Sequence, residues 1–402
     1  IGEWGAELLF DRTLRGIPGE RIIEIDALGR EIKLLQENPT VKGEDLKLSI
    51  DINLQKAAEE AFAGRAGAVV ALKPDTGEIL GLVSRPSFDP NLFARGVNYS
   101  QWAALIQDKK VPMLNRALQS QYPPGSTFKI VTAIAALNEG VITPDTKVTC
   151  TGGITYGKWQ FGCWKKGGHG TVSLHRAIVE SCDVYFYEAG KRLGIDKIAE
   201  YARKLGLGSE TGLQLVKERS GLIPDTKWKH EKRNQQWYLG ETFNAAIGQG
   251  YVAATPMQMA QLMSVVANGG LIYRPVMVKA EAPLQPVASA DIKPQVLALV
   301  RDSLYGVVNE GGGTGGAARS SIAAVGGKTG TAQVVSIRKS SHQLPEKFRD
   351  HAWFVAFAPV EKPAIALCVF IEHGGHGGGA AAPIAKLAIE AYLKSEKLKA
   401  EN

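Results

Sequence analysis

Five strand-sized apolar runs, divided between the two ends of the chain, constrain the fold more than any other feature. Helical patterns fill the interval between the early pair and the late trio, so strands from both ends must meet to complete one hydrophobic layer. Turn-forming residues separate the early pair as in a β-hairpin. We therefore expect an α/β fold of the mixed α+β kind, with helices on both faces of one sheet. The runs cover residues 67–72, 77–83, 328–335, 351–358 and 364–371.

The first part of the chain has a different character. Residues 1–45 are polar and interrupted by glycines, and they predict a helix followed by strands. We interpret them as the remnant of a preceding domain, and residues 46–402 as the main domain. No apolar run reaches the roughly 18–20 residues of a membrane helix. The chain begins with Ile1 instead of Met, so we expect it to be part of a longer protein whose anchor or signal lies elsewhere.

The composition fits an ordinary folded protein, and the net charge indicates which class of ligand the protein could bind. The 402 residues are 45% hydrophobic, enough for a substantial core. The formal net charge is +7, and the lysines and arginines are scattered without a dense basic block. This distribution argues against nucleic acid as a partner and suits an anionic surface or an acidic ligand.

Residues 122–129 (Tyr-Pro-Pro-Gly-Ser-Thr-Phe-Lys) join a turn to an apolar helical pattern. Ser126 is expected near the helix N-terminus, and Lys129 one turn further on the same face. A serine hydroxyl needs a nearby base to act as a nucleophile, and free N–H groups at a helix start suit an oxyanion. The same residues also fit a simple helix cap with a solvated lysine. Ser336 and Lys339 repeat the spacing, so the pair alone decides nothing.

Two further short motifs follow in a fixed order. They are Ser181-x-Asp183 and residues 328–331 (Lys-Thr-Gly-Thr), the latter at the start of a strand pattern. Together with Ser126-x-x-Lys129, they form the triple found in serine β-lactamases and penicillin-binding proteins. A phosphate-binding loop is a poor alternative for the third motif, because position 322 is Ile where that loop requires Gly.

The surrounding sequence extends this resemblance. Residues 122–129, Gly-Gln-Gly at 248–250, Gly-Lys-Thr-Gly-Thr-Ala at 327–332 and residues 351–359 resemble the class B penicillin-binding proteins, and among them the elongation-type members of rod-shaped bacteria. The resemblance implies a penicillin-binding, serine β-lactamase-like transpeptidase fold with a five-stranded, mostly antiparallel sheet. It also implies that residues 1–45 are the end of a pedestal domain.

The resemblance implies a role for each catalytic side chain. Ser126 would be the nucleophile and Lys129 its general base. The amine of Lys129 must then be partly neutral, which burial and a second cation, Lys328, would favour. Ser181 would bridge the two lysines and pass a proton to the leaving amine. Asp183 replaces the Asn that is common in the wider family, and it would pair with Lys129 or with the substrate.

The same resemblance implies how substrate is held. Lys328 would attract its carboxylate, and the hydroxyls of Thr329 and Thr331 would bind it. Gly330 would let the substrate backbone approach the strand edge as an added strand. The N–H groups of Ser126 and Thr331 would form the oxyanion hole.

The implied function is a serine-type D-Ala-D-Ala transpeptidase that cross-links peptidoglycan stem peptides and is acylated by β-lactams. No cofactor is expected for catalysis. Implied partners are a SEDS-family glycosyltransferase and rod-shape scaffold proteins, with an N-terminal anchor in the bacterial inner membrane and the catalytic domain in the periplasm. Two alternatives remain: a D-Ala carboxypeptidase or β-lactamase-like hydrolase, and a non-catalytic penicillin sensor or scaffold.

Three cysteines and a histidine form a separate cluster in the sequence. Cys150, Cys163, His169 and Cys182 have the composition of a tetrahedral zinc site, although tight Cys-x-x-Cys pairs are missing. We predict a structural zinc that supports the Ser181 motif from behind. A Cys150–Cys163 disulfide with Cys182 free, or three buried thiols without a metal, are the alternatives.

Overall fold

A computed structural model describes residues 2, 4–213, 215–334 and 345–401. The chain divides into two compact units. The smaller comprises residues 1–48 with 213–217, and the larger comprises residues 49–212 with 218–402. In the described part of the chain, no helix has the length and apolar character needed to cross a bilayer.

The smaller unit consists of two short helices and an antiparallel hairpin. All residues of the two hairpin strands are exposed, so the hairpin has no core of its own. An isolated two-stranded hairpin is marginally stable in water, so contacts with further protein surface would stabilise this one. The elements are α1 (Gly5–Leu9), α2 (Asp11–Arg15), β1 (Glu20–Ile25) and β2 (Glu31–Asn38).

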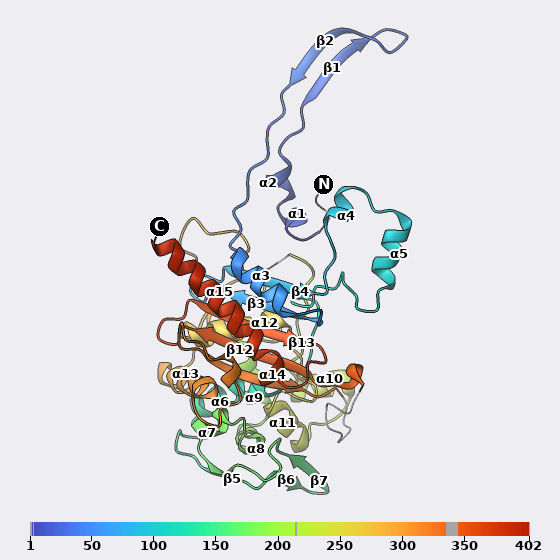
Figure 1. The fold of residues 1–402 in the computed structure, drawn as a ribbon. Helices are drawn as coiled ribbons and strands as arrows, with labels where there is room; N and C mark the ends of the chain where they lie inside the picture. Colours follow the sequence, from blue (N-terminus) through green and yellow to red (C-terminus); the bar gives the residue numbers. More distant parts are fainter. Residues whose placement is uncertain (1, 3, 214, 335–344, 402) are drawn as a thin grey trace. The chain divides into compact units, whose positions relative to one another are not determined.

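A five-stranded sheet organises the larger unit (Figure 1). Its order is β11-β12-β13-β3-β4, and every neighbouring pair is antiparallel. The N- and C-terminal strands meet where Val369 pairs with Val69, so the predicted joining of the two ends is confirmed. The strands are β3 (Gly67–Leu72), β4 (Ile79–Arg85), β11 (Gly326–Ala332), β12 (His351–Ala358) and β13 (Ile365–Ile371).

Helices cover both faces of this sheet, which explains why its central strands are apolar throughout. Every residue of β3, β12 and β13 is buried. Alternate residues pack with α3 (Ile52–Ala61) and α15 (Ala382–Glu401) in one hydrophobic cluster. The fully buried α12 (Pro256–Ala267) contacts β13 and β3 but contributes nothing to that cluster, as expected for a helix on the opposite face.

Two predicted helices differ from the structure at the Ser126 and Ser181 motifs. The helix expected from residue 126 begins as a 3-10 turn, η1 (Gly125–Phe128), and continues as α6 (Lys129–Asn138). The helical pattern of residues 174–193 predicts one continuous helix, and this prediction is wrong: α7 (Leu174–Val179) ends before Ser181, and α8 (Asp183–Leu193) starts after it.

Smaller differences lie in the connections. The sequence of residues 86–115 lacks a clear periodicity and predicts a loop, but the structure has α4 (Asn91–Ala94) and α5 (Tyr99–Gln107) there. The irregular stretch after residue 147 contains short strands: β5 (Val148–Cys150), β6 (Gly153–Tyr156), β7 (Trp159–Gly162) and β8 (Gly170–Val172). The remaining elements are α9 (Ile195–Lys204), α10 (Thr226–Arg233), α11 (Leu239–Ala246), β9 (Leu271–Ile272), β10 (Ala288–Ser289), α13 (Pro294–Asn309), η2 (Gly316–Ala318), η4 (Glu346–Phe348) and α14 (Gly377–Ala380).

Candidate active site

Ser126 lies in the turn that leads into α6, and this turn is pressed against strand β11. Gly125 has a φ of +57°, and a Cβ at this position would stand 2.4 Å from the carbonyl oxygen of Thr331. Only glycine fits both restrictions. The N–H of Gly125 also donates to the carbonyl of Gly248 at 2.9 Å. The turn is therefore held between β11 and the 248–250 loop, with Ser126 partly exposed.

The Lys129 ammonium is fully buried and is held by three acceptors on one short segment. Its Nζ lies 2.9 Å from the carbonyl oxygen of Ser181, 3.2 Å from Oγ of Ser181 and 2.7 Å from Oδ1 of Asp183. Three donors and three acceptors match, so the buried charge is compensated. The structure thus joins the first and second motifs, as the sequence predicts.

Ser181 owes its position to the break between α7 and α8. Its φ of +56° falls in the left-handed region, where a residue with a side chain is strained by about 1 kcal/mol. Its N–H bonds to the carbonyl of Ile178, and the N–H of Cys182 bonds to that of Ala177, closing the end of α7. This tight turn lets both the carbonyl and the hydroxyl of Ser181 face Lys129.

Lys328, on β11, is the second buried lysine of the site. Its Nζ donates to the carbonyl of Thr329 at 3.2 Å. Burial and then the charge of Lys129 lower the pKa of Lys328 well below its ordinary 10.5, and Asp183 partly opposes them. Holding a proton on Lys328 is therefore costly without a bound anion, which suits a group that waits for a carboxylate.

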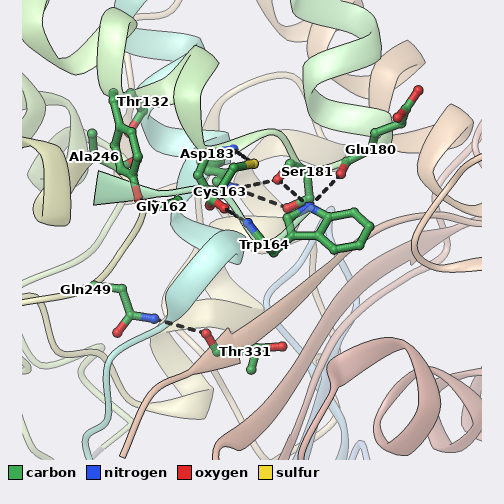
Figure 2. A network of polar contacts seen from close by, with 12 residues as sticks. Thr132, Gly162, Cys163, Trp164, Glu180, Ser181, Asp183, Ala246, Gln249 and Thr331 are labelled. Atoms are coloured by element: carbon green, nitrogen blue, oxygen red, sulfur yellow. Dashed lines mark hydrogen bonds and ion pairs between the residues drawn. The ribbon is translucent and has the colours of Figure 1, made fainter. Parts of the chain in front are cut away.

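The rest of the third motif is arranged along the same strand. The hydroxyl of Thr329 lies 2.7 Å from that of Thr314, and Nε2 of Gln249 donates to the carbonyl of Thr331 at 3.0 Å (Figure 2). A Cβ on Gly330 would stand 2.7 Å from the carbonyl oxygen of Pro124, so this glycine allows the turn and the strand to approach closely.

Three residues without an assigned role in the sequence analysis contact the site directly, although one of them, Gln249, was noted there as part of the Gly-Gln-Gly motif. Thr314 positions Thr329, and Gln249 fixes the end of the motif on β11. Trp164 donates from its indole to the carbonyls of Glu180 and Ser181 and from its backbone to Asp183 (Figure 2). Its place directly after Cys163 was the one available signal. Ser336 and Lys339, which repeat the Ser-x-x-Lys spacing, lie outside the described residues.

The four predicted metal ligands come together behind the Ser181 motif. One ligand atom each from Cys150, Cys163, His169 and Cys182 lies within 4.8 Å of the others. The Nδ1 atom of His169 is 3.6 Å from the sulfur of Cys150 and 3.5 Å from that of Cys163. Sulfur and nitrogen ligands of a tetrahedral zinc ion stand about 3.6 Å apart, given bonds of about 2.3 and 2.05 Å. These residues therefore fit zinc.

The thiols of this cluster interact strongly. A hydrogen bond from Cys182 lowers the pKa of Cys163 to about 5, and the same contact together with burial raises the pKa of Cys182. All three cysteines are free thiols, so the disulfide alternative is not formed here. Cys163 also accepts the N–H of Asp183 at 3.4 Å, which ties the cluster to the active-site turn. The fourth cysteine, Cys368, lies in the apolar run 364–371, which predicts a buried core position, and it is buried in β13.

The active site of the serine acyltransferases that react with penicillin is defined by three motifs in a fixed arrangement. They are a serine at a helix start with a lysine one turn later, a Ser-x-Asp turn, and a Lys-Thr-Gly strand. Residues 67–390 match the family described as penicillin binding protein transpeptidase domain, and residues 1–48 match the penicillin-binding protein dimerisation domain. The chain belongs to the penicillin-binding protein transpeptidase family.

Individual relatives narrow the comparison to the elongation-type branch. The chain is 38% identical over 412 residues to peptidoglycan D,D-transpeptidase MrdA of Acinetobacter baumannii, covering 99% of this chain. It spans only 61% of that relative's length. Pseudomonas aeruginosa PBP2, solved with WCK 5153, is 40% identical with a TM-score of 0.80, over 88% of this chain and 77% of that one.

A second solved structure supports the same branch. PBP2 of Helicobacter pylori, in a complex with MreC, is 34% identical with a TM-score of 0.88. The alignment covers 98% of this chain and 72% of that one. The predicted resemblance to elongation-type class B penicillin-binding proteins is therefore confirmed.

Proposed function

We propose that this chain carries the catalytic part of a peptidoglycan D,D-transpeptidase that acts during cell elongation. The observation that carries the proposal is the buried Lys129 ammonium, which bonds to both the hydroxyl and the carbonyl of Ser181, one helical turn from Ser126. A buried amine held this way beside a partly exposed serine supplies the base that a serine nucleophile requires.

In the first half-reaction, Ser126 Oγ attacks the penultimate carbonyl of a stem peptide ending in D-Ala-D-Ala. Lys129, whose charge Asp183 balances at 2.7 Å, must first give up its proton. Its neutral amine then takes the proton of Ser126, and Asp183 stabilises the ammonium that forms again. Ser181, 3.2 Å from Lys129, returns the proton to the departing D-Ala amine as the peptide bond breaks. The N–H groups of Ser126 and Thr331 stabilise the oxyanion.

In the second half-reaction, the amine of a neighbouring stem peptide attacks the acyl-enzyme. Lys129 takes a proton from this amine and delivers it to Oγ of Ser126 as the ester bond breaks. The cross-linked product forms, and the free enzyme is restored. Lys328, Thr329 and Thr331 hold the terminal carboxylate of the donor before D-Ala departs. A β-lactam presents the same carboxylate and a strained amide, and it would acylate Ser126 in the same way.

Product analysis with a synthetic donor tests this proposal against its alternatives. A depsipeptide or thioester analogue of the stem terminus is incubated with the protein and D-amino acid acceptors. Acceptor-dependent exchange that outpaces hydrolysis supports the transpeptidase. Hydrolysis alone would instead identify a carboxypeptidase or β-lactamase-like enzyme, and no turnover together with no penicillin adduct would identify a scaffold.

We also propose that Cys150, Cys163, His169 and Cys182 hold one structural zinc ion. The fit of the interatomic distances to a tetrahedral site supports this. The ion would neutralise the thiolates and fix the stretch that contacts Asp183 from behind, without entering the chemistry.

The remaining expectations concern the whole protein. We propose that residues 1–45 are the remnant of a pedestal domain, and that residues 46–402 form the catalytic domain. We further propose an inner-membrane anchor outside this sequence, a periplasmic catalytic domain, and association with a SEDS-family glycosyltransferase. The H. pylori complex with MreC supports a rod-shape scaffold protein as another partner. Co-purification of the full-length protein with each partner tests these associations.

A further inference from the structure

Trp164 is an exposed tryptophan whose two N–H groups both bond to the protein. About 58% of the residue is accessible to solvent, yet both of its N–H groups bond to the Ser181–Asp183 segment or the residue before it. Burial does not require these bonds, because an exposed indole N–H can bond to water. The function of Trp164 should therefore lie in the residues that accept its two N–H groups.

The indole N–H is shared between two consecutive carbonyl oxygens. It lies 3.0 Å from that of Glu180 and 3.1 Å from that of Ser181 (Figure 2). The carbonyl of Ser181 also accepts the Lys129 ammonium at 2.9 Å. One donor from outside the turn therefore holds both carbonyls that flank the strained φ of Ser181.

The backbone N–H of Trp164 makes a second contact with the same segment. It donates to Oδ2 of Asp183 at 3.0 Å, while Oδ1 of the same carboxylate accepts from Lys129 at 2.7 Å. Two of the groups that hold Lys129, the Ser181 carbonyl and the Asp183 carboxylate, are thus also held by Trp164. The adjacent Cys163 accepts the N–H of Asp183, so residues 163 and 164 together hold both Asp183 and the carbonyls before it.

We propose that Trp164 is a positioning residue for acylation, which sets the Ser181 carbonyl and hydroxyl against Lys129. This inference rests on the proposed function. Without the indole N–H, the carbonyl of Ser181 keeps only Lys129 as a partner among the described residues, and Ser181 can relax toward ordinary backbone angles. Such a change would move the hydroxyl that must accept and return the proton, while the cleft that binds the ligand keeps its shape.

The test replaces the indole N–H without removing the ring. Trp164→Phe keeps an aromatic side chain, and incorporation of benzothienylalanine at position 164 keeps the bicyclic shape with sulfur in place of N–H. Trp159→Phe is the matched control, since Trp159 is 63% exposed and its ring contacts Lys158. Stopped-flow acylation by a fluorescent penicillin separates the acylation rate constant from the dissociation constant of the noncovalent complex.

Both Trp164 replacements should lower the acylation rate constant about tenfold, which is the size of one lost hydrogen bond. The dissociation constant, the metal content and the melting temperature should stay near the wild-type values, and Trp159→Phe should leave every value unchanged. An unchanged rate constant in the benzothienylalanine protein would overturn the proposal. So would a loss confined to the dissociation constant, which would make Trp164 a ligand contact instead. A wild-type protein that is not acylated at all would refute the proposed function itself.

Discussion

The ammonium of Lys129 and the carboxylate of Asp183 form a buried ion pair at 2.7 Å between residues 54 positions apart in the sequence. Lys129 has no exposed surface, whereas Asp183 keeps 10% of its side chain accessible. The pair joins the start of α6 to the start of α8, and so connects the nucleophile turn with the Ser181 motif.

Asp183→Asn should destabilise the fold by about 2–4 kcal/mol, because it leaves the buried charge of Lys129 without a counter-ion. The amide oxygen can still accept one hydrogen bond, so Asp183→Ala should cost more. Urea denaturation measures both. Glu200→Gln is the control: Glu200 bonds to Lys197 at 3.0 Å on the surface, and its loss should cost less than about 1 kcal/mol. Equal stability of Asp183→Asn and wild type would contradict the importance of the pair.

Lys328 should make stability depend on pH in the alkaline range. Its pKa is lowered in the native state by burial and by Lys129, whereas the unfolded chain keeps the ordinary value of 10.5. Between those two values the unfolded state binds one more proton than the native state, so the free energy of unfolding rises with pH by up to about 1.4 kcal/mol per unit.

Lys328→Met should remove this rise, so that the variant gains relative stability as the pH falls from 10.5. The exposed Lys232→Met serves as the control and should leave the slope unchanged. Denaturation series from pH 6 to 10 give the slopes. A wild-type slope that survives in Lys328→Met would assign the pH dependence to another group.

Substitution of Gly125 tests the contact between the turn that carries Ser126 and strand β11. Gly125→Ala places a Cβ 2.4 Å from the carbonyl oxygen of Thr331 at a φ of +57°, so the turn must shift. Gly140→Ala shares the positive φ, +71°, but its Cβ would meet no atom within 4 Å. Gly140→Ala should cost only about 1 kcal/mol, whereas Gly125→Ala should also lower penicillin acylation at least about a hundredfold. Similar acylation by both variants would show that the contact does not position Ser126.

Metal analysis tests the cluster behind the turn. The dialysed protein should contain about one zinc ion per chain, and Cys150→Ser or His169→Ala should lose it. Cys368→Ser, at a buried cysteine in the sheet, should keep the metal. Removal of zinc with a chelator should slow acylation because the stretch that contacts Asp183 loosens. A metal-free wild-type protein with intact acylation would contradict the proposed site.

The sheet and the three motifs could be predicted because both depend on local sequence. Residues 351–358 form the predicted strand without any shift of boundary, since a run that is apolar on both faces fits only a buried strand. The N- and C-terminal strands could be placed together because neither set alone completes a sheet.

The break at Ser181 could not be predicted in the same way. Residues 174–193 carry continuous helical periodicity, and no glycine or proline marks residues 180–182. The left-handed Ser181 is held by Lys129 and Trp164, which are distant in sequence, so tertiary contacts override local propensity there. The role of Trp164 was missed for the same reason: its place after Cys163 was a local signal, but its hydrogen bonds to residues 180, 181 and 183 are tertiary contacts.

The most direct test of the account is the intact mass of the protein after timed incubation with benzylpenicillin. We predict one penicilloyl adduct per chain, mapped to Ser126, slow to dissociate and absent from Ser126→Ala. Ser336→Ala, which removes the serine of the second Ser-x-x-Lys sequence, should be acylated like wild type. No adduct on the wild-type protein, or an adduct that persists in Ser126→Ala, would contradict the account.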